Sequence, residues 1–198
     1  MDKPNAASCE RNRDPILAVL RDYLGGKRHL LEIGSGTGQH AAYFASQFPQ
    51  MVWQTSEREE NLPGIRAWLA DAALPNTPAP RELEVSGSWP ADAFDAVFTA
   101  NTLHIMAWSD VEHLFAQLPA VTLPGAMLIA YGPFNYEGRF SSPSNAAFDQ
   151  SLRESADHMG IRDAEAVDAL AHCAGFELVA DIAMPANNRC RVWRRNGA

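Results

Sequence analysis

The sequence has few cysteines, fewer positive than negative charges, and no long apolar run. Its three cysteines, Cys9, Cys173 and Cys190, form no C-x-x-C pair, which argues against a disulfide framework and a zinc site. The six histidines are scattered along the chain, so we expect no bound metal. Sixteen Lys and Arg against 24 Asp and Glu give a net charge of −8, which disfavours a broad surface for nucleic acid or anionic membranes.

These absences favour a globular protein that works in solution. No stretch approaches the roughly 18 apolar residues of a membrane span, and residues 1–12 are too polar for a secretory signal peptide. We therefore expect a cytoplasmic protein with no membrane partner. The length of 198 residues predicts a single domain over residues 1–198. A basic group of four arginines is expected to be a solvated edge strand and tail: Arg189, Arg191, Arg194 and Arg195.

Apolar runs of strand length alternate with amphipathic stretches of helix length along most of the chain. Strands are expected at residues 29–33, 51–55, 81–85, 94–99, 126–131, 177–183 and 189–194. Helices are expected at residues 15–24, 39–48, 62–74, 109–121, 145–155 and 163–174. This alternation predicts an α/β fold with a parallel sheet covered on both faces, to which the short final connection adds an antiparallel strand. Residues 1–26 would form an N-terminal helical segment, and the turn-rich residues 132–160 a lid insertion.

A glycine-rich turn follows the first expected strand, in the order Glu32-Ile33-Gly34-Ser35-Gly36-Thr37-Gly38-Gln39. Glycines let the backbone turn sharply and approach a ligand closely. A dinucleotide fingerprint needs its third glycine at position 39, where this chain has Gln39. The Glu32 carboxylate would repel a pyrophosphate but suits the ammonium of an amino-acid group. The pattern therefore disfavours an NAD-dependent oxidoreductase, while a purely structural turn stays an alternative.

Acidic and polar residues follow the next strands at the same edge of the expected sheet. Glu57 lies just beyond the second strand, where a carboxylate can accept both ribose hydroxyls of an adenosine. Glu84 and Val85 come at the end of the third strand, and Asn101 follows the fourth. Ligands of such sheets bind beyond the carboxyl ends of the strands, so these residues are candidates to hold an adenine and a methionine tail.

Taken together, these motifs resemble a class I S-adenosylmethionine-dependent methyltransferase. The likeness rests on E-x-G-x-G-x-G, the downstream acidic residue and F-D-A-V-F-x-x-N-x-L-H. The sequence is similar, more closely still, to the methyltransferase-like 26 family. The segments that carry this second resemblance are residues 11–17, 35–41, 53–57, 131–134, 160–163 and 184–188. Family members usually have Asp where Glu57 and Glu84 stand, which keeps the charge.

The resemblance implies a single-domain, Rossmann-like methyltransferase fold, with a seven-stranded, mostly parallel sheet whose last strand is antiparallel. It implies S-adenosyl-L-methionine as the cofactor. The cofactor-binding residues that it implies are Glu32, Gly34, Ser35, Gly36, Gly38, Glu57, Glu84, Val85 and Asn101. In this assignment the glycine turn borders the methionine part, Glu57 holds the ribose, and Glu84 with Val85 lies near the adenine.

A methyl acceptor with a high pKa also needs a base, and histidine is the side chain best poised near neutral pH. His104 is the candidate, because it follows the fourth strand at the binding edge, and a packing role is its alternative. The residues proposed to meet the acceptor are Asn12, Tyr131, Phe134, Asn187 and Asn188. The two aromatic residues have a core position as their alternative, and the two final asparagines a left-handed turn.

Other functions stay open besides methyl transfer. The chain could bind the cofactor without turnover, or use the fold only as an interaction platform. Methylation of nucleic acid is disfavoured, because the residues after the fourth strand lack the Pro-Pro-aromatic element of amino-directed base methylases and the chain has no Pro-Cys nucleophile. We therefore expect a small-molecule acceptor.

Overall fold

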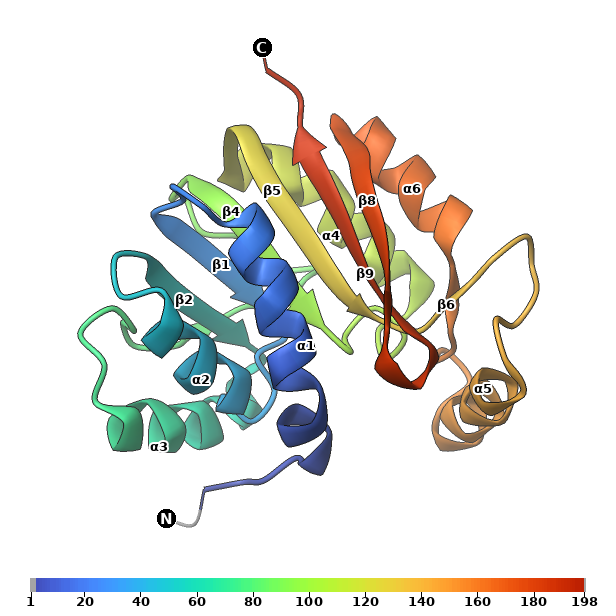
Figure 1. The fold of residues 1–198 in the computed structure, drawn as a ribbon, viewed down its shortest axis with the longest axis horizontal. Helices are drawn as coiled ribbons and strands as arrows, with labels where there is room; N and C mark the ends of the chain where they lie inside the picture. The colour runs from blue at the N-terminus through green and yellow to red at the C-terminus, as the bar shows by residue number, and fades with distance from the viewer. Residues whose placement is uncertain (1–2, 198) are drawn as a thin grey trace.

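A seven-stranded sheet forms the centre of the structure (Figure 1). The computed structural model describes residues 3–197, so residues 1, 2 and 198 of the expected domain lie outside the described residues. The strands of this sheet are β1 (His29–Ile33), β2 (Val52–Glu57), β3 (Arg81–Glu82), β4 (Phe94–Ala100), β5 (Thr122–Gly132), β8 (Phe176–Met184) and β9 (Asn188–Arg195). Their order is β3-β2-β1-β4-β5-β9-β8, and β9 runs antiparallel to both of its neighbours. The expected fold class is confirmed.

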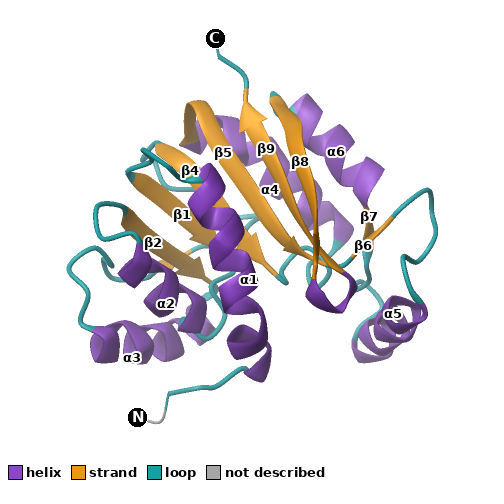
Figure 2. Ribbon diagram, viewed as in Figure 1, coloured by secondary structure: helices purple, strands orange, loops and turns teal. Residues whose placement is uncertain are grey.

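Helices cover both faces of the sheet (Figure 2). One face carries α1 (Ala7–Tyr23), α2 (Gln39–Gln47) and α3 (Leu62–Ala72), and the other carries α4 (Trp108–Val121) and α6 (Ala164–Cys173). The remaining elements are the short helices η1 (Glu59–Asn61) and η2 (Pro185–Asn187), the helix α5 (Pro143–Ser155), and the two strands β6 (Phe134–Asn135) and β7 (Arg162–Asp163). Strands β6 and β7 pair in parallel as a second, small sheet, and α5 lies beyond the β8 side of the large sheet.

Strand residues alternate between two apolar cores, one on each face of the sheet. In β1, Leu30 belongs to the core beneath α1, α2 and α3, whereas Leu31 belongs to the core beneath α4 and α6. In β5, Ile129 and Leu128 divide in the same way. Because a slip of one residue would exchange the two faces, this double burial fixes the register of the central strands.

Helix α1 begins at Ala7, well before the start that Pro15 suggested. Proline is common in the first turn of a helix, but here Pro15 lies in the interior. The proline removes one backbone donor, and the burial of residues such as Leu20 on the same helix compensates. The N–H of Ala6 donates to the side chain of Gln39 at 2.6 Å, which fastens the start of α1 to α2.

Two strands, β3 and β5, differ in length from the expectation by more than two residues. Strand β3 ends at Glu82, because the chain then turns, with the N–H of Gly87 donating to the carbonyl of Glu84 at 2.8 Å. Strand β5 already begins at Thr122, so Pro124-Gly125 does not break the chain as expected. A bulge absorbs the extra residues, since Phe94 pairs with Thr122 and Ala96 with Met127.

The prediction that the four arginines form a solvated edge strand and tail is wrong, because β9 lies inside the sheet and not at its edge. Arg191 is only 2% exposed and forms ion pairs with Asp168, at 2.5 Å, and with Asp181. Arg189 also pairs with Asp181, at 2.7 Å, and of the four arginines only Arg194 is exposed. Local sequence did not reveal this burial, because it depends on which strands flank β9.

Candidate functional site

A cavity of about 520 Å³ lies at the carboxyl ends of β1, β2, β3 and β4. It is bounded by the first turn of α1, the turns after these strands, and the segment before β7. The lining residues are Ala6, Ser8, Cys9, Ile33, Gly34, Ser35, Gly36, Thr37, His40, Glu57, Arg58, Asn61, Leu83, Glu84, Val85, Ala100, Asn101, Thr102, Ile105, Met106, Ala107, Asp110, His158 and Met159. Seven of the nine residues expected to bind a cofactor are in this set; Glu32 and Gly38 are not.

The three glycines of the turn after β1 all have a left-handed backbone, but they serve different purposes. A Cβ on Gly34 would lie 2.6 Å from the side chain of Thr102, and one on Gly38 would lie 2.9 Å from the Cα of Ile65. These two glycines allow close packing within the protein. A Cβ on Gly36 would meet nothing within 4 Å. Gly36 therefore leaves its face of the turn open to the cavity.

The Glu57 carboxylate lies at the end of β2 and is held by two backbone donors. Oε2 accepts from the N–H of Gly36 at 2.9 Å, and Oε1 accepts from the N–H of Arg58 at 3.0 Å. These bonds fix the carboxylate beside the glycine turn while it still lines the cavity. The arrangement suits a ligand that carries neighbouring hydroxyl donors.

Glu32 is buried behind the turn, where it does not line the cavity. Its side chain is 2% exposed, and Oε2 accepts from the indole N–H of Trp53 at 2.8 Å. Burial raises the pKa of this carboxyl to about 7, although the hydrogen bonds from Trp53 and Ser35 oppose the shift. Glu32 therefore stands one layer behind the cavity wall, and its expected place near the ammonium of a cofactor stays a prediction.

One end of the cavity is mainly apolar. Leu83 and Val85 after β3 are buried, and Ile105 and Met106 after β4 line the same cavity. Met159 joins them from the segment before β7. A flat, weakly polar group such as a nucleobase fits this end, whereas the glycine turn and Glu57 offer polar partners. Val85 lies at this end, and its expected place near an adenine stays a prediction.

Asn101 lies where β4 ends and lines the cavity. Its backbone is left-handed, with φ of 57°, a conformation that asparagine tolerates better than most residues. Its N–H donates to the carbonyl of Tyr131 at 2.8 Å, which holds the turn against β5. The structure thus places Asn101 beside Gly34 and Thr102 at the wall of the cavity.

His104 lies beside the cavity and does not line it. Its imidazole is 5% exposed and contacts the ring of Phe148 on α5 edge-on, with 5.4 Å between the ring centroids. Burial lowers its pKa to about 4, with a smaller contribution from the nearby Arg162. The geometry supports the packing alternative, and we assign His104 no role as a base.

The residues expected to meet an acceptor also lie outside the cavity lining. Asn12 is buried and its Oδ1 accepts from Nε2 of His40 at 2.7 Å. Tyr131 and Phe134 are core residues, 5% and 2% exposed. Asn12 thus bonds the protein itself, and Tyr131 and Phe134 occupy the core positions that were their alternative.

Asn187 and Asn188 form the turn between β8 and β9 and are bonded to the protein itself. The carbonyl of Asn187 accepts from Asn145 at 3.0 Å, and its side chain donates to the hydroxyl of Ser144 at 3.0 Å. Asn188 bonds the carbonyl of Pro185 at 3.2 Å. The left-handed turn, with φ of 57° at Asn187, is therefore the role that the structure supports.

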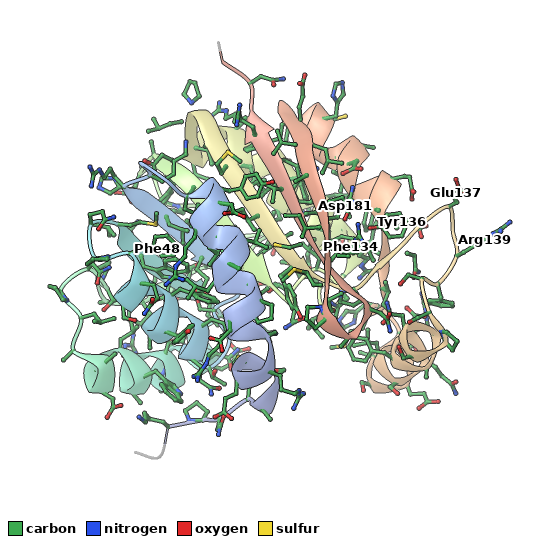
Figure 3. All side chains as sticks on the ribbon, in the orientation of Figure 1. Phe48, Phe134, Tyr136, Glu137, Arg139 and Asp181 are labelled. Carbon is green, nitrogen blue, oxygen red and sulfur yellow. The ribbon has the colours of Figure 1, made fainter. Side chains whose placement is uncertain are left out.

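The expected lid, residues 132–160, meets the cavity only through His158 and Met159. Figure 3 shows Phe134, Tyr136 and Asp181 on the β8 side of the molecule, with Glu137 and Arg139 on the outer loop. The Tyr136 hydroxyl donates to Asp181 at 2.7 Å, which ties this segment to the hairpin. Apart from His158 and Met159, the segment contributes no residue to the cavity lining.

The first turn of α1 is one part of the site that the sequence did not reveal, as is the turn after β4 with Ile105 and Met106. Ser8 and Cys9 line the cavity, together with His40 of α2. Burial lowers the pKa of His40 to about 4, so this imidazole is neutral at physiological pH. The residues before Pro15 are compatible with a helix and could have indicated this turn. The expected helix began at Pro15 and so left them out.

Two further features concern residues 3–197 as a whole. In this part of the chain no group of three or more His, Cys, Asp and Glu side chains is arranged to hold a metal ion. None of the helices described here combines the length and the apolar character needed to cross a membrane.

Comparison with known proteins assigns the family. Residues 3–195 match the family described as "Protein of unknown function (DUF938)", and the chain belongs to this family. A trans-aconitate 2-methyltransferase from Acidovorax ebreus (strain TPSY) is 28% identical over 188 residues, covering 93% of this chain and 66% of that protein. The corresponding protein from Acidovorax sp. (strain JS42) is 27% identical with the same coverage. The chain thus spans just under two thirds of the length of these curated relatives.

Solved structures share the fold. An O-methyltransferase family protein from Burkholderia thailandensis superposes with a TM-score of 0.85 at 14% identity, over 96% of this chain and 58% of that one. Human N-acetylserotonin methyltransferase, solved in complex with SAM, gives a TM-score of 0.79 at 17% identity, over 96% of this chain and 53% of that one. The fold is therefore that of class I methyltransferases, while the closer resemblance to the methyltransferase-like 26 family stays a prediction.

Proposed function

We propose that this protein binds S-adenosyl-L-methionine and transfers its methyl group to a small molecule. The observation that carries the proposal is the fixed Glu57 carboxylate beside the open face of Gly36, in a cavity on a class I methyltransferase fold. The names of the relatives, which include methyltransferases from two Acidovorax strains, support the same reaction.

The residues of the cavity fit the parts of this cofactor. Glu57 offers carboxylate oxygens to the ribose hydroxyls, and Leu83 and Val85 offer an apolar wall to the adenine. Gly36 lets the amino-acid part approach the backbone closely, and Gly34 lies in the same turn at the cavity wall. Asn101 lies at the end of β4, on the other side of the glycine turn from Glu57. Each assignment follows from the chemistry of the lining residues and their order along the sheet edge.

The bound cofactor supplies an electrophilic methyl group on a sulfonium. The contribution of the protein is to align this group with an acceptor, and alignment of this kind is worth roughly 7–11 kcal/mol of barrier. Ser8 and Cys9 of α1 line the same cavity. Because His104 lies outside the cavity, we propose that positioning, and not proton removal by this histidine, is what the chain provides.

The charges around the cavity favour a neutral or cationic acceptor. Glu57, Glu84 and Asp110 line it, against a single arginine or lysine, Arg58. Arg58 already pairs with Glu60 at 3.2 Å. A polycarboxylate such as aconitate would need cationic partners to leave water. We therefore propose a different acceptor class from the one in the names of the Acidovorax relatives.

Isothermal calorimetry tests the cofactor assignment. We expect S-adenosylhomocysteine to bind in the micromolar range, and NAD neither to bind nor to compete. A protein that binds NAD and not S-adenosylhomocysteine would overturn the proposal. Screening of amines, phenols and polycarboxylates for methyl transfer from a labelled cofactor then tests the acceptor class, and preferential methylation of a polycarboxylate would overturn that part.

A further inference from the structure

Arg162, the first residue of β7, donates hydrogen bonds to backbone carbonyls of two separate segments. Its Nε bonds the carbonyl of Leu103 at 3.1 Å, and its Nη2 bonds the carbonyls of Met106 and, at 2.9 Å, His158. The guanidinium also lies over the ring of Trp108 at the start of α4, 5.9 Å from its centroid. One side chain thus links the turn after β4 to the segment before β7.

Both linked segments form the apolar wall of the cavity. Ile105 and Met106 come from the turn after β4, and His158 and Met159 come from the segment before β7. Apart from Arg162, a backbone bond joins them, from the N–H of Gly160 to the carbonyl of His104 at 2.9 Å. The position of this wall therefore depends strongly on the arginine.

The segment before β7 has little freedom to move away from this arrangement. The buried carboxylate of Asp149 accepts from the N–H of Ile161 at 2.7 Å and pairs with Arg153. A Cβ on Gly160 would lie 2.9 Å from the Arg153 guanidinium, so the chain passes close beneath α5. The backbone next to Arg162 is consequently held in place, and the arginine side chain reaches the turn after β4 from there.

We propose that Arg162 is a positioning residue that holds the apolar wall of the cavity against the adenine of the cofactor; this inference rests on the proposed function. Only arginine combines a fixed fork of donors with a permanent charge, which matches carbonyls from two segments at once. Arg162 does not itself line the cavity. Its effect is transmitted through Ile105, Met106 and Met159.

Calorimetry of Arg162→Ala, Arg162→Lys and the wild-type protein tests this role. The probes are S-adenosylhomocysteine and 5′-methylthioadenosine, which share the adenosine but differ in the amino-acid part. Arg162→Ala should weaken both ligands by a similar factor, roughly 3- to 30-fold, the range for residues that act without contact. Arg162→Lys keeps the charge with a single donor group and should lie between the alanine variant and the wild type.

Glu154→Ala is the matched control, because Glu154 lies on α5 in the same region, is exposed, and bonds Gln150 of the same helix. It should bind both probes as the wild type does. Measurements well below the melting temperature separate affinity from stability, and hydrogen exchange should rise at residues 103–107 and 156–160 and not in β1. If Arg162→Ala does not fold, the lysine variant and its exchange pattern decide.

The outcomes separate this inference from the proposed function. A wild-type protein that binds neither probe overturns the proposed function. Wild-type binding that is unchanged in both Arg162 variants overturns only the role of Arg162. Weakening of S-adenosylhomocysteine without weakening of 5′-methylthioadenosine overturns the assignment of this wall to the adenine.

Discussion

The turn after β1 and the turn between β8 and β9 share a left-handed backbone but use it differently. Gly36, with φ of 55°, has no side chain and leaves its face open to the cavity. Asn187, with φ of 57°, has a side chain that bonds Ser144, and its carbonyl bonds Asn145. The first turn is thus available to a ligand, whereas the second fastens the hairpin to α5.

The difference teaches that a sequence motif can specify a backbone shape without specifying its use. Both turns are distinctive in the sequence, and both were expected to form part of the site. Whether the polar groups of a turn face a cavity or the protein depends on the elements packed next to it. The predictions below test this division between a binding half, the cavity around the turn after β1, and a structural half, the β8–β9 hairpin with its neighbours.

The largest expected effect comes from the structural half. Arg191→Ala removes the shared partner of Asp168 and Asp181 and should lower the free energy of unfolding by about 3–5 kcal/mol, since breaking a buried ion pair leaves uncompensated charge. Chemical denaturation measures this loss. Arg194→Ala, an exposed change on the same strand, should cost little. The folded Arg191 variant should keep its affinity for S-adenosylhomocysteine, and a weakened affinity would break the division.

The pH dependence of stability should reveal Glu32. Burial raises the pKa of its carboxyl from 4.5 in the unfolded chain to about 7 in the folded protein. The folded state therefore holds the proton more tightly, and this contribution to stability is present at low pH and lost as the pH rises through about 7. At 1.36 kcal/mol per pKa unit, the loss approaches about 3 kcal/mol.

Glu32→Gln isolates this contribution, because the amide does not ionise. The difference in unfolding free energy between variant and wild type should rise in favour of the variant between about pH 5 and about pH 8. The low pKa of His40, which makes stability fall as the pH drops from about 6.5 to about 4, is present in both proteins and cancels. A flat difference would show that Glu32 titrates normally.

Glu57→Ala tests the binding half. Removal of the carboxylate should weaken S-adenosylhomocysteine binding about ten- to a hundredfold, because hydrogen bonds to a charged group contribute about 1.5–3 kcal/mol. Calorimetry measures this change. Glu59→Ala, a nearby exposed substitution that does not line the cavity, is the control and should leave the affinity unchanged. Equal affinities for all three proteins would assign Glu57 to solvent.

The smallest changes in stability come from the two left-handed turns themselves. Gly36→Ala should cost about 1–2 kcal/mol for a side chain in this backbone region, and Asn187→Ala about 1 kcal/mol for its lost hydrogen bond. Only Gly36→Ala should also weaken S-adenosylhomocysteine binding, by about tenfold or more, because its Cβ would occupy ligand space. Equal binding by both variants would remove the distinction between the turns.

The part of the fold that the sequence predicted is the part set by local pattern. Alternation of strands and helices gave the sheet and its covered faces, and the glycine turn with Glu57 gave the main wall of the cavity. In these places a few neighbouring residues are enough to determine the conformation of the backbone.

The part that the sequence did not predict depends on distant neighbours. The burial of Arg191 follows from the insertion of β9 between β5 and β8, which no local pattern encodes. His104 follows a strand at the right edge, yet Phe148 from α5 covers its ring. The contribution of Ser8 was missed because Pro15 resembled a helix start.

The insertion of β9 also has a consequence for the order of events during synthesis. Strand β8 is made first, yet its neighbour in the large sheet is β9, which follows it in the chain. Ribosomes add about 5–20 residues per second. Until β9 has been made, β8 has no partner strand and one edge of β5 is unpaired. A chain that stalls before residue 188 would therefore present two strands with unpaired edges, β5 and β8, to chaperones or to other nascent chains.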